Sequence, residues 1–181
     1  MKDEIAIMTK FDHPHVIKHF ESYEDARYIF IVMEALTNST ELFEIIQAAR
    51  RTGNPEKSCF PEEMIRWVMY GIMSGLSHIH GNGITHRDLK PQNILIDQEK
   101  QVLKIIDFGL SKKNSEAHEA GLMIGTVDYI TPEVFMSQGD PNAYAPPCDV
   151  WAVGLICYQM VTGTNPLKKN NLKNTIRAIA Q

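Results

Sequence analysis

The sequence has few cysteines, no long apolar run and no surplus of positive charge, and each shortage excludes a class of protein. Its three cysteines, Cys59, Cys148 and Cys157, lack the paired spacing of a zinc site or a disulfide framework. We therefore interpret them as small buried hydrophobes in a reducing compartment. No apolar run approaches the roughly 18 residues that span a bilayer, and the first residues lack the apolar stretch of a signal peptide. We expect an intracellular protein without a membrane partner. The cytoplasm is the simplest location, and these features are also compatible with the nucleus.

The net charge of −4 gives the chain no sequence-wide basic field. Such a field supplies most of the non-specific affinity for nucleic acid, so we predict no nucleic-acid partner. The 181 residues are 44% hydrophobic, which is enough for one buried core, and they contain neither an internal repeat nor a low-complexity tract. These properties predict a single domain.

Hydrophobic periodicity indicates several helices and short strands. From Pro61 to Gly81 apolar residues recur every three to four positions, which predicts a long amphipathic helix. Residues 148–162 are apolar nearly all round, so we expect a helix buried at the centre of a helical lobe and ended by Gly163. Residues 94–97 and 102–106 flank a polar turn and predict a hairpin. At the start we expect a helix end followed by two strands, and at residues 171–181 one more helix.

Residues 86–93 read HRDLKPQN and resemble the catalytic loop of protein kinases. The resemblance implies that Asp88 accepts the proton of a substrate hydroxyl, Lys90 neutralises charge on the moving phosphate, and Asn93 holds a magnesium ion. A lone His-x-Asp would more simply be a polar turn. Eight consecutive matching residues between a predicted helix and a predicted strand favour the catalytic interpretation instead.

Other motifs follow in the order of the same family. Asp107-Phe108-Gly109 comes after a predicted strand, which implies that Asp107 is the second magnesium ligand. The runs "DFGLSKK" and "IGTVDYITPEV" look closest to the calcium- and calmodulin-dependent kinases and their calcium-dependent relatives. Lys90 and Thr126 match the serine/threonine pattern, so the implied substrate is a protein with a serine or threonine acceptor. No EF-hand loop is present, so any calcium-sensing module would lie outside this chain.

The implied fold is α+β and kinase-like, with a mostly helical large lobe and a remnant of the small lobe that comprises a helix end and two strands. The resemblance covers nearly the whole chain and divides it into a small-lobe remnant (1–33), a hinge (34–40) and a large lobe (41–181) that is incomplete at its end. We expect one partial kinase domain.

The resemblance also implies an ATP site. Glu4 corresponds to the helix glutamate that pairs with an ATP-orienting lysine, and Met33 to the gatekeeper. The remaining residues assigned to ATP are Glu34 and Leu36 at the adenine, Leu95 and Ile106 below it, and Glu41 at the ribose or the substrate. The sequence departs from the family at His19, where a leucine is usual in the stacked column, and in a hinge-to-helix turn that is one residue longer.

Supporting and regulatory roles follow from the same resemblance. Asp149 would brace the catalytic loop, and His86 and Phe108 would stack in the apolar column that joins the lobes. Arg87 would read a phosphate on the activation segment, for which Ser115 is the candidate, although that segment could equally be an unmodified polar loop. Glu133 would pair with an arginine that this chain does not contain.

The chain has no glycine-rich loop and no V-A-I-K lysine. Because the loss of one preorganised charge-stabilising donor costs roughly 10² to 10³ in rate, we expect a fragment with little activity alone. Three hypotheses remain open: part of an active kinase, a non-catalytic kinase-like binding or scaffold module, and a nucleotide-binding switch without transfer.

Overall fold

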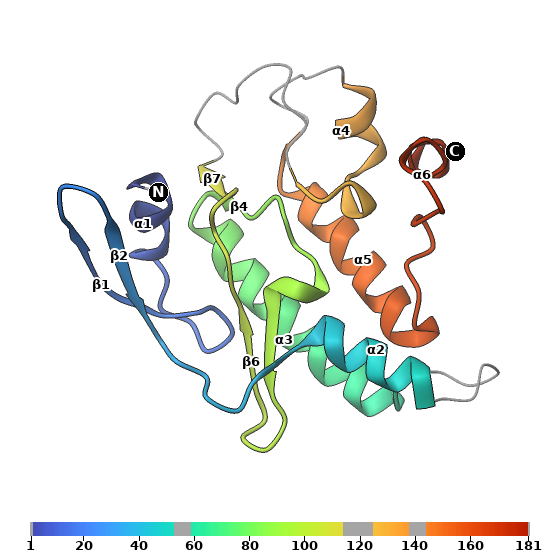
Figure 1. Ribbon diagram of the computed structural model, residues 1–181, viewed down its shortest axis with the longest axis horizontal. Helices are drawn as coiled ribbons and strands as arrows, with labels where there is room; N and C mark the ends of the chain where they lie inside the picture. Colours follow the sequence, from blue (N-terminus) through green and yellow to red (C-terminus); the bar gives the residue numbers. More distant parts are fainter. Residues whose placement is uncertain (1, 53–58, 114–124, 138–143, 181) are drawn as a thin grey trace.

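The computed structural model describes residues 2–52, 59–113, 125–137 and 144–180 (Figure 1). Its first part comprises helix α1 (Lys2–Met8) and the antiparallel hairpin of β1 (His19–Glu24) and β2 (Ile29–Met33). The Asp25 carboxylate closes the hairpin turn by accepting hydrogen bonds from two backbone amides at 2.7 Å each. The hairpin forms a sheet of its own.

The second part is mostly helical. Its longer helices are α2 (Leu42–Thr52), α3 (Glu62–Gly81) and α5 (Pro147–Thr162). The shorter helical segments are η1 (Pro91–Asn93), η2 (Val127–Tyr129), α4 (Pro132–Met136) and α6 (Leu172–Ile179), and the strands are β3 (Thr40–Glu41), β4 (Ile84–Thr85), β5 (Ile94–Asp97), β6 (Val102–Ile105) and β7 (Lys112–Lys113). Strands β3, β5 and β6 form one antiparallel sheet, and β4 pairs with β7.

Helix α3 is the centre of this part because it packs against α5 on one side and β6 on another. Its buried apolar residues recur at helical spacing, and Gly71 and Gly75 allow the close approach of the β6 side chains Leu103 and Ile105. One continuous core extends from α1 through α3 to α5. The small hairpin reaches this core through the segment before it, where Ile17 N donates to Ile105 O at 3.0 Å.

The mixed α+β architecture and the predicted long helix and strand hairpin are confirmed. The prediction that α5 is buried all round is wrong. Its side toward α3 is buried, but Val150, Tyr158 and Val161 on the other side remain 41 to 49% exposed within the described part of the chain. An apolar composition shows that a helix can be buried, not how many neighbours cover it. Two of the three cysteines, Cys59 and Cys157, are likewise only partly buried.

Across the residues that the structure describes, none of the helices combines the length and the apolar character needed to cross a membrane.

Candidate active site

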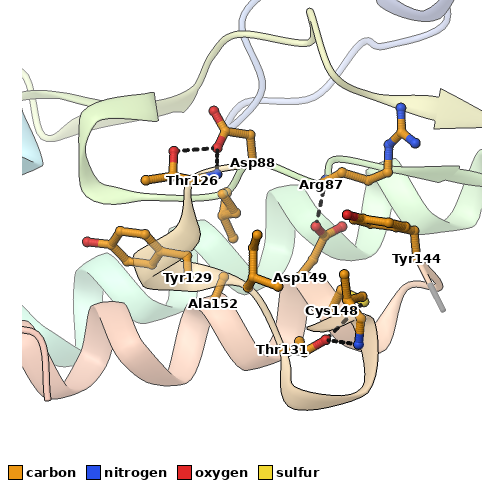
Figure 2. A pocket seen from close by; sticks show the side chains of 12 residues that line it. Arg87, Asp88, Thr126, Tyr129, Thr131, Tyr144, Cys148, Asp149 and Ala152 are labelled. Carbon is orange, nitrogen blue, oxygen red and sulfur yellow. Dashed lines mark hydrogen bonds between the residues drawn. The ribbon is translucent and has the colours of Figure 1, made fainter. Parts of the chain in front are cut away.

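The segment 86–90 turns sharply between β4 and η1, and a buried carboxylate from α5 holds the turn. Arg87 has φ of 67°, in the left-handed region that costs a non-glycine residue about 1–3 kcal/mol. Asp149, which is 1% exposed, compensates by accepting the backbone N–H group of His86 at 2.9 Å. It also accepts the backbone N–H group of Arg87 at 2.9 Å (Figure 2). Its Oδ2 also lies 2.8 Å from His80 Nε2 on α3. Asp149 therefore ties the turn to both central helices.

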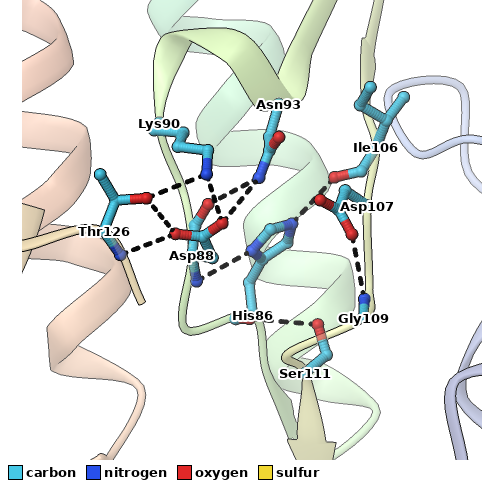
Figure 3. A network of polar contacts seen from close by, with 9 residues as sticks. All are labelled: His86, Asp88, Lys90, Asn93, Ile106, Asp107, Gly109, Ser111 and Thr126. Carbon is cyan, nitrogen blue, oxygen red and sulfur yellow. Dashed lines mark hydrogen bonds and ion pairs between the residues drawn. The ribbon is translucent and has the colours of Figure 1, made fainter. Parts of the chain in front are cut away.

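Four donors converge on the Asp88 carboxylate (Figure 3). Oδ1 accepts hydrogen bonds from Thr126 N at 3.0 Å and Thr126 Oγ1 at 2.8 Å. Oδ2 accepts from Lys90 Nζ at 2.6 Å and Asn93 Nδ2 at 3.3 Å. Lys90 Nζ also donates to Thr126 Oγ1 at 2.9 Å. The structure thus brings together an acid, a cation, an amide and a hydroxyl at one point.

Gly125 permits the approach of Thr126 from a segment 38 residues away. Its φ is 102°, and a Cβ at this position would lie 2.7 Å from the Arg87 carbonyl oxygen. Any larger residue would therefore be strained and would push the backbone away from the loop.

The 107–109 segment lies on the other side of Asp88 from Thr126 (Figure 3). Asp107 also has a left-handed φ, 64°, and its Oδ1 accepts the Gly109 N–H at 3.1 Å. Phe108 is buried between two rings, with centroid distances of 5.1 Å to His86 and 4.9 Å to Phe11. The next turn is held by Ser111 Oγ, which donates to the His86 carbonyl at 3.1 Å.

The donor set at this point fits a magnesium ion shared with phosphates. Asn93 Nδ2 faces Asp88, so its Oδ1 is directed elsewhere, and the Asp107 carboxylate is exposed. Within the described ranges no three or more His, Cys, Asp or Glu side chains form a metal cage. Mg²⁺ is typically held by one or two protein oxygens together with substrate phosphates and water, which is what Asn93 and Asp107 can offer.

The whole chain, residues 1–181, matches the protein kinase domain. The chain belongs to the protein kinase domain family. It is 37% identical over 176 residues, 97% of its length, to the SNF1-related protein kinase catalytic subunit alpha KIN12 of Arabidopsis thaliana. It is 32% identical over 180 residues (99%) to the probable serine/threonine-protein kinase fhkC of Dictyostelium discoideum, and 34% over 166 residues (92%) to the serine/threonine-protein kinase AtPK1/AtPK6 of Arabidopsis thaliana.

These matches cover 33%, 29% and 33% of the three relatives, so the chain spans about a third of their length. Members of the protein kinase family generally use ATP and Mg²⁺ and act on protein substrates.

In this kinase domain, α1 brings Glu4 beside the 107–109 segment. A Cβ on Gly109 would lie 3.9 Å from Glu4 Oε1 and 3.2 Å from Asp107 Oδ1. Glu34 forms an ion pair with Lys104 at 2.8 Å, a contact that links the end of β2 to β6. Sequence reasoning missed Lys104 because it is a charged residue in a buried strand.

The other residues predicted at the ATP site lie on β2, β3 and β5 or just after β2 and β6. Met33 is 44% exposed on β2, and the Leu36 carbonyl accepts hydrogen bonds from Ser39. Glu41 on β3 pairs across the sheet with Leu95 on β5. Ile106 is half-buried, and its backbone amide donates to the Asn93 carbonyl at 2.9 Å.

Arg87 lies partly buried on the outer side of the turn. Its Nε donates to the Leu110 carbonyl at 2.6 Å, and its guanidinium lies 5.8 Å from the Tyr144 ring centroid. Burial lowers the pKa of Arg87.

Ser115, the predicted phosphorylation site, lies outside the described residues, and Glu133 is exposed on α4. Arg87 also lines a mostly apolar cavity of about 20 Å³, which has room for about one water, and Figure 2 shows the side chains around it.

Besides Lys104, sequence reasoning missed two residues that shape the site. His80 reaches Asp149 from the last turn of α3, and Phe11 contacts Phe108 in the apolar column. His19 stands where the family usually has a leucine of the apolar column. In this structure its Nε2 lies 2.7 Å from Ser22 Oγ, within the hairpin. The helical spacing of Phe11 with Met8 was the available signal for its burial, whereas no sequence pattern pairs His80 with Asp149.

Proposed function

We propose that this chain is the transfer part of a protein serine/threonine kinase, which moves the terminal phosphoryl group of ATP to a serine or threonine hydroxyl of a protein. The observation that carries the proposal is the Asp88 carboxylate, which Lys90, Asn93 and Thr126 contact within 3.3 Å. The similarity to named serine/threonine protein kinases supports it.

In the proposed reaction Asp88 is the base. The acceptor oxygen forms a bond to phosphorus, its proton passes to Asp88, and the bond from phosphorus to the bridging oxygen of ADP breaks. A carboxylate has about four acceptor positions, and four donors already contact Asp88. An acceptor hydroxyl must therefore replace one of them. The contact from Asn93 Nδ2 is the longest of the four and the easiest to replace, because Nδ2 keeps its hydrogen bond to the Asp88 carbonyl at 2.8 Å.

Lys90 places a positive charge where charge develops on the transferred group. Its Nζ lies 2.6 Å from Asp88 Oδ2, so one ammonium can neutralise both the base and a phosphoryl oxygen. Asn93 Oδ1 and Asp107 would hold Mg²⁺, which supplies charge neutralisation at the phosphates when bound. Glu4, beside Asp107, would meet an ATP-orienting lysine. The adenine side would comprise Met33, Glu34, Leu36, Leu95 and Ile106, with Glu41 at the ribose or the substrate.

The test is Asp88→Asn in the native protein, with Glu99→Gln as a surface control that also removes one carboxylate. Loss of the base should lower kcat about 10²- to 10⁴-fold. The increase in Tm on addition of Mg-ATP should be retained. Unchanged turnover in Asp88→Asn would contradict the assigned role. A native protein that folds, binds a partner and transfers no phosphate would instead favour a binding or scaffold module.

We also propose that the chain belongs to the calcium- and calmodulin-dependent group of kinases. The runs "DFGLSKK" at 107–113 and "IGTVDYITPEV" at 124–134 support this narrower placement. Phosphorylation rates of the native protein, measured with and without calcium and calmodulin, test it. A rate that is insensitive to both argues against this group.

A further inference from the structure

Positive charge is concentrated at the end of the chain. Residues 150–181 contain four lysines or arginines and no aspartate or glutamate. The whole chain carries −4, so residues 1–149 carry −8. The four cations are Lys168, Lys169, Lys173 and Arg177. A chain that is acidic up to residue 149 thus carries a basic segment after it.

This segment borders a groove beside α6. The groove has a volume of about 380 Å³ and is lined by Lys169, Asn170, Asn174, Arg177 and Ala178. All but Ala178 are exposed. Two cationic groups and two amides therefore face one hollow, and such N–H donors match the oxygens of a carboxylate.

The cations have little compensation within the described residues. Lys168 pairs with Asp128 at 3.5 Å, and Lys169 Nζ donates to the Pro166 carbonyl at 2.7 Å. Neither Lys173 nor Arg177 forms an ion pair there, although both lie on α6 four positions apart, where like charges destabilise a helix. Arg177 in the last turn of α6 complements the helix dipole, but Lys173 in the first turn gains no such stabilisation. An external anion would stabilise both cations.

The groove is linked to the acceptor side of the catalytic loop. Helix α6 packs against η2, and Asn165 Nδ2 donates to the Asp128 carbonyl of η2 at 3.0 Å. The residue directly before η2 is Thr126, which contacts Asp88. In Figure 3 Thr126 and Asp107 lie on opposite sides of Asp88, so the groove connects to the side away from the proposed magnesium ligands.

We propose that this groove binds aspartate and glutamate side chains of the protein substrate, so that the enzyme favours serine or threonine acceptors in acidic segments. The inference rests on the proposed kinase function, because it names the substrate class of the same site. A protein segment fits better than a nucleic acid, since the groove is short and the rest of the chain, at −8, repels a long polyanion.

The experiment compares three serine peptides, flanked by glutamate, by glutamine or by lysine, as substrates of the native protein. The charge-neutralising variant is Lys169→Gln with Arg177→Gln, which removes the two cations that line the groove. The matched control is Arg27→Gln with Arg51→Gln, which removes the same charge from exposed positions on the β1–β2 turn and at the end of α2. The ratio of kcat/KM for the glutamate peptide to that for the glutamine peptide is the readout.

We expect this ratio to be about fivefold or more at low ionic strength in the native protein and the control, and to fall to about one in the groove variant. It should also shrink as salt is raised. Arg177→Lys should retain most of the preference. A ratio of one in the native protein, or an unchanged ratio in the groove variant, overturns the inference.

Failure of the kinase function has a different signature. If no peptide is phosphorylated, the proposed function fails. Binding of the labelled glutamate peptide, measured by fluorescence anisotropy, then tests the groove independently of catalysis. Binding lost in the groove variant but not in the control supports the groove, and equal binding in all three proteins overturns it. An unspecific single-stranded oligonucleotide that binds the groove more tightly than the peptide also overturns it, in favour of a nucleic-acid site.

Discussion

Thr126 contributes a backbone and a side-chain hydrogen bond to the same oxygen of Asp88, and its hydroxyl also accepts from Lys90. Thr126→Ala removes the hydroxyl but leaves the backbone contact. Because hydrogen bonds to charged groups contribute about 1.5–3 kcal/mol, we expect kcat/KM to fall about tenfold or more. Thr126→Ser keeps the hydroxyl and should stay within about threefold of the native protein. Steady-state kinetics on one serine peptide measures both, and equal losses in the two variants would contradict a role for the hydroxyl.

Single residues differ in how far sequence could predict their surroundings. Asp88, Lys90 and Asn93 lie within six positions of one another, so a short turn brings them together and their spacing carried the prediction. His80 meets Asp149 across 69 positions, and that contact depends on how α3 crosses α5. Composition and spacing do not indicate how two helices cross. The sequence therefore predicted that Asp149 braces the catalytic loop, but not that His80 contacts Asp149.

At the scale of elements, a histidine cluster fixes the turn that leads from α1 to the hairpin. His13 Nδ1 accepts the backbone N–H of His15 at 3.1 Å, and its Nε2 lies 3.3 Å from Ser74 Oγ. Its ring stacks on His78 of α3, with centroids 5.0 Å apart and planes 23° apart. Because Nδ1 can accept only when it carries no proton, the turn requires neutral His13.

This turn should make the fold sensitive to acid. Burial lowers the pKa of His13 from its ordinary 6.5, with further contributions from His78, His15 and Lys104. The unfolded chain therefore binds the proton more tightly, so the stabilisation is present above pH 6.5 and is lost as the pH falls through the lowered pKa.

His13→Asn separates the two effects, because an asparagine side chain can accept the same i+2 amide without titrating in this range. We expect the Tm of the native protein to fall more steeply than that of His13→Asn between pH 7.5 and 5.5, measured by thermal unfolding. The remaining histidines are common to both proteins and serve as the internal control. Parallel Tm profiles would show that His13 does not titrate on unfolding.

Elements were predictable where one face is buried. The periodicity of α3 carried its prediction because core residues recur every three to four positions and Gly83 lies just beyond its end. The α5 prediction failed on one face because an all-apolar helix has no period from which to read the covered side. The extent of its burial depends on neighbours, which the helix sequence does not contain.

At the scale of the whole molecule, the hairpin is the part with the weakest attachment. Strands β1 and β2 pair only with each other among the described strands, and Phe20, Tyr23 and Phe30 are at least half exposed. By contrast α3 contributes six fully or nearly buried residues to the core.

We therefore expect hydrogen exchange to separate the two parts. The hydrogen-bonded amides of β1 and β2 should exchange at least about tenfold faster than those in the middle of α3, because local opening of the hairpin exposes little buried surface. Exchange mass spectrometry of the native protein measures the two rates, with the exposed first turn of α3 as a reference for fraying. Protection of the hairpin equal to that of α3 would show that both parts unfold as one unit.

The link from His80 through Asp149 to the catalytic turn has a pharmacological consequence. A small molecule that wedges between α3 and α5 and captures the Asp149 carboxylate would release the strained Arg87 backbone and displace Asp88. Such a compound would inhibit without competing with ATP. Its selectivity among related enzymes would depend on helix packing instead of on the chemistry of nucleotide recognition.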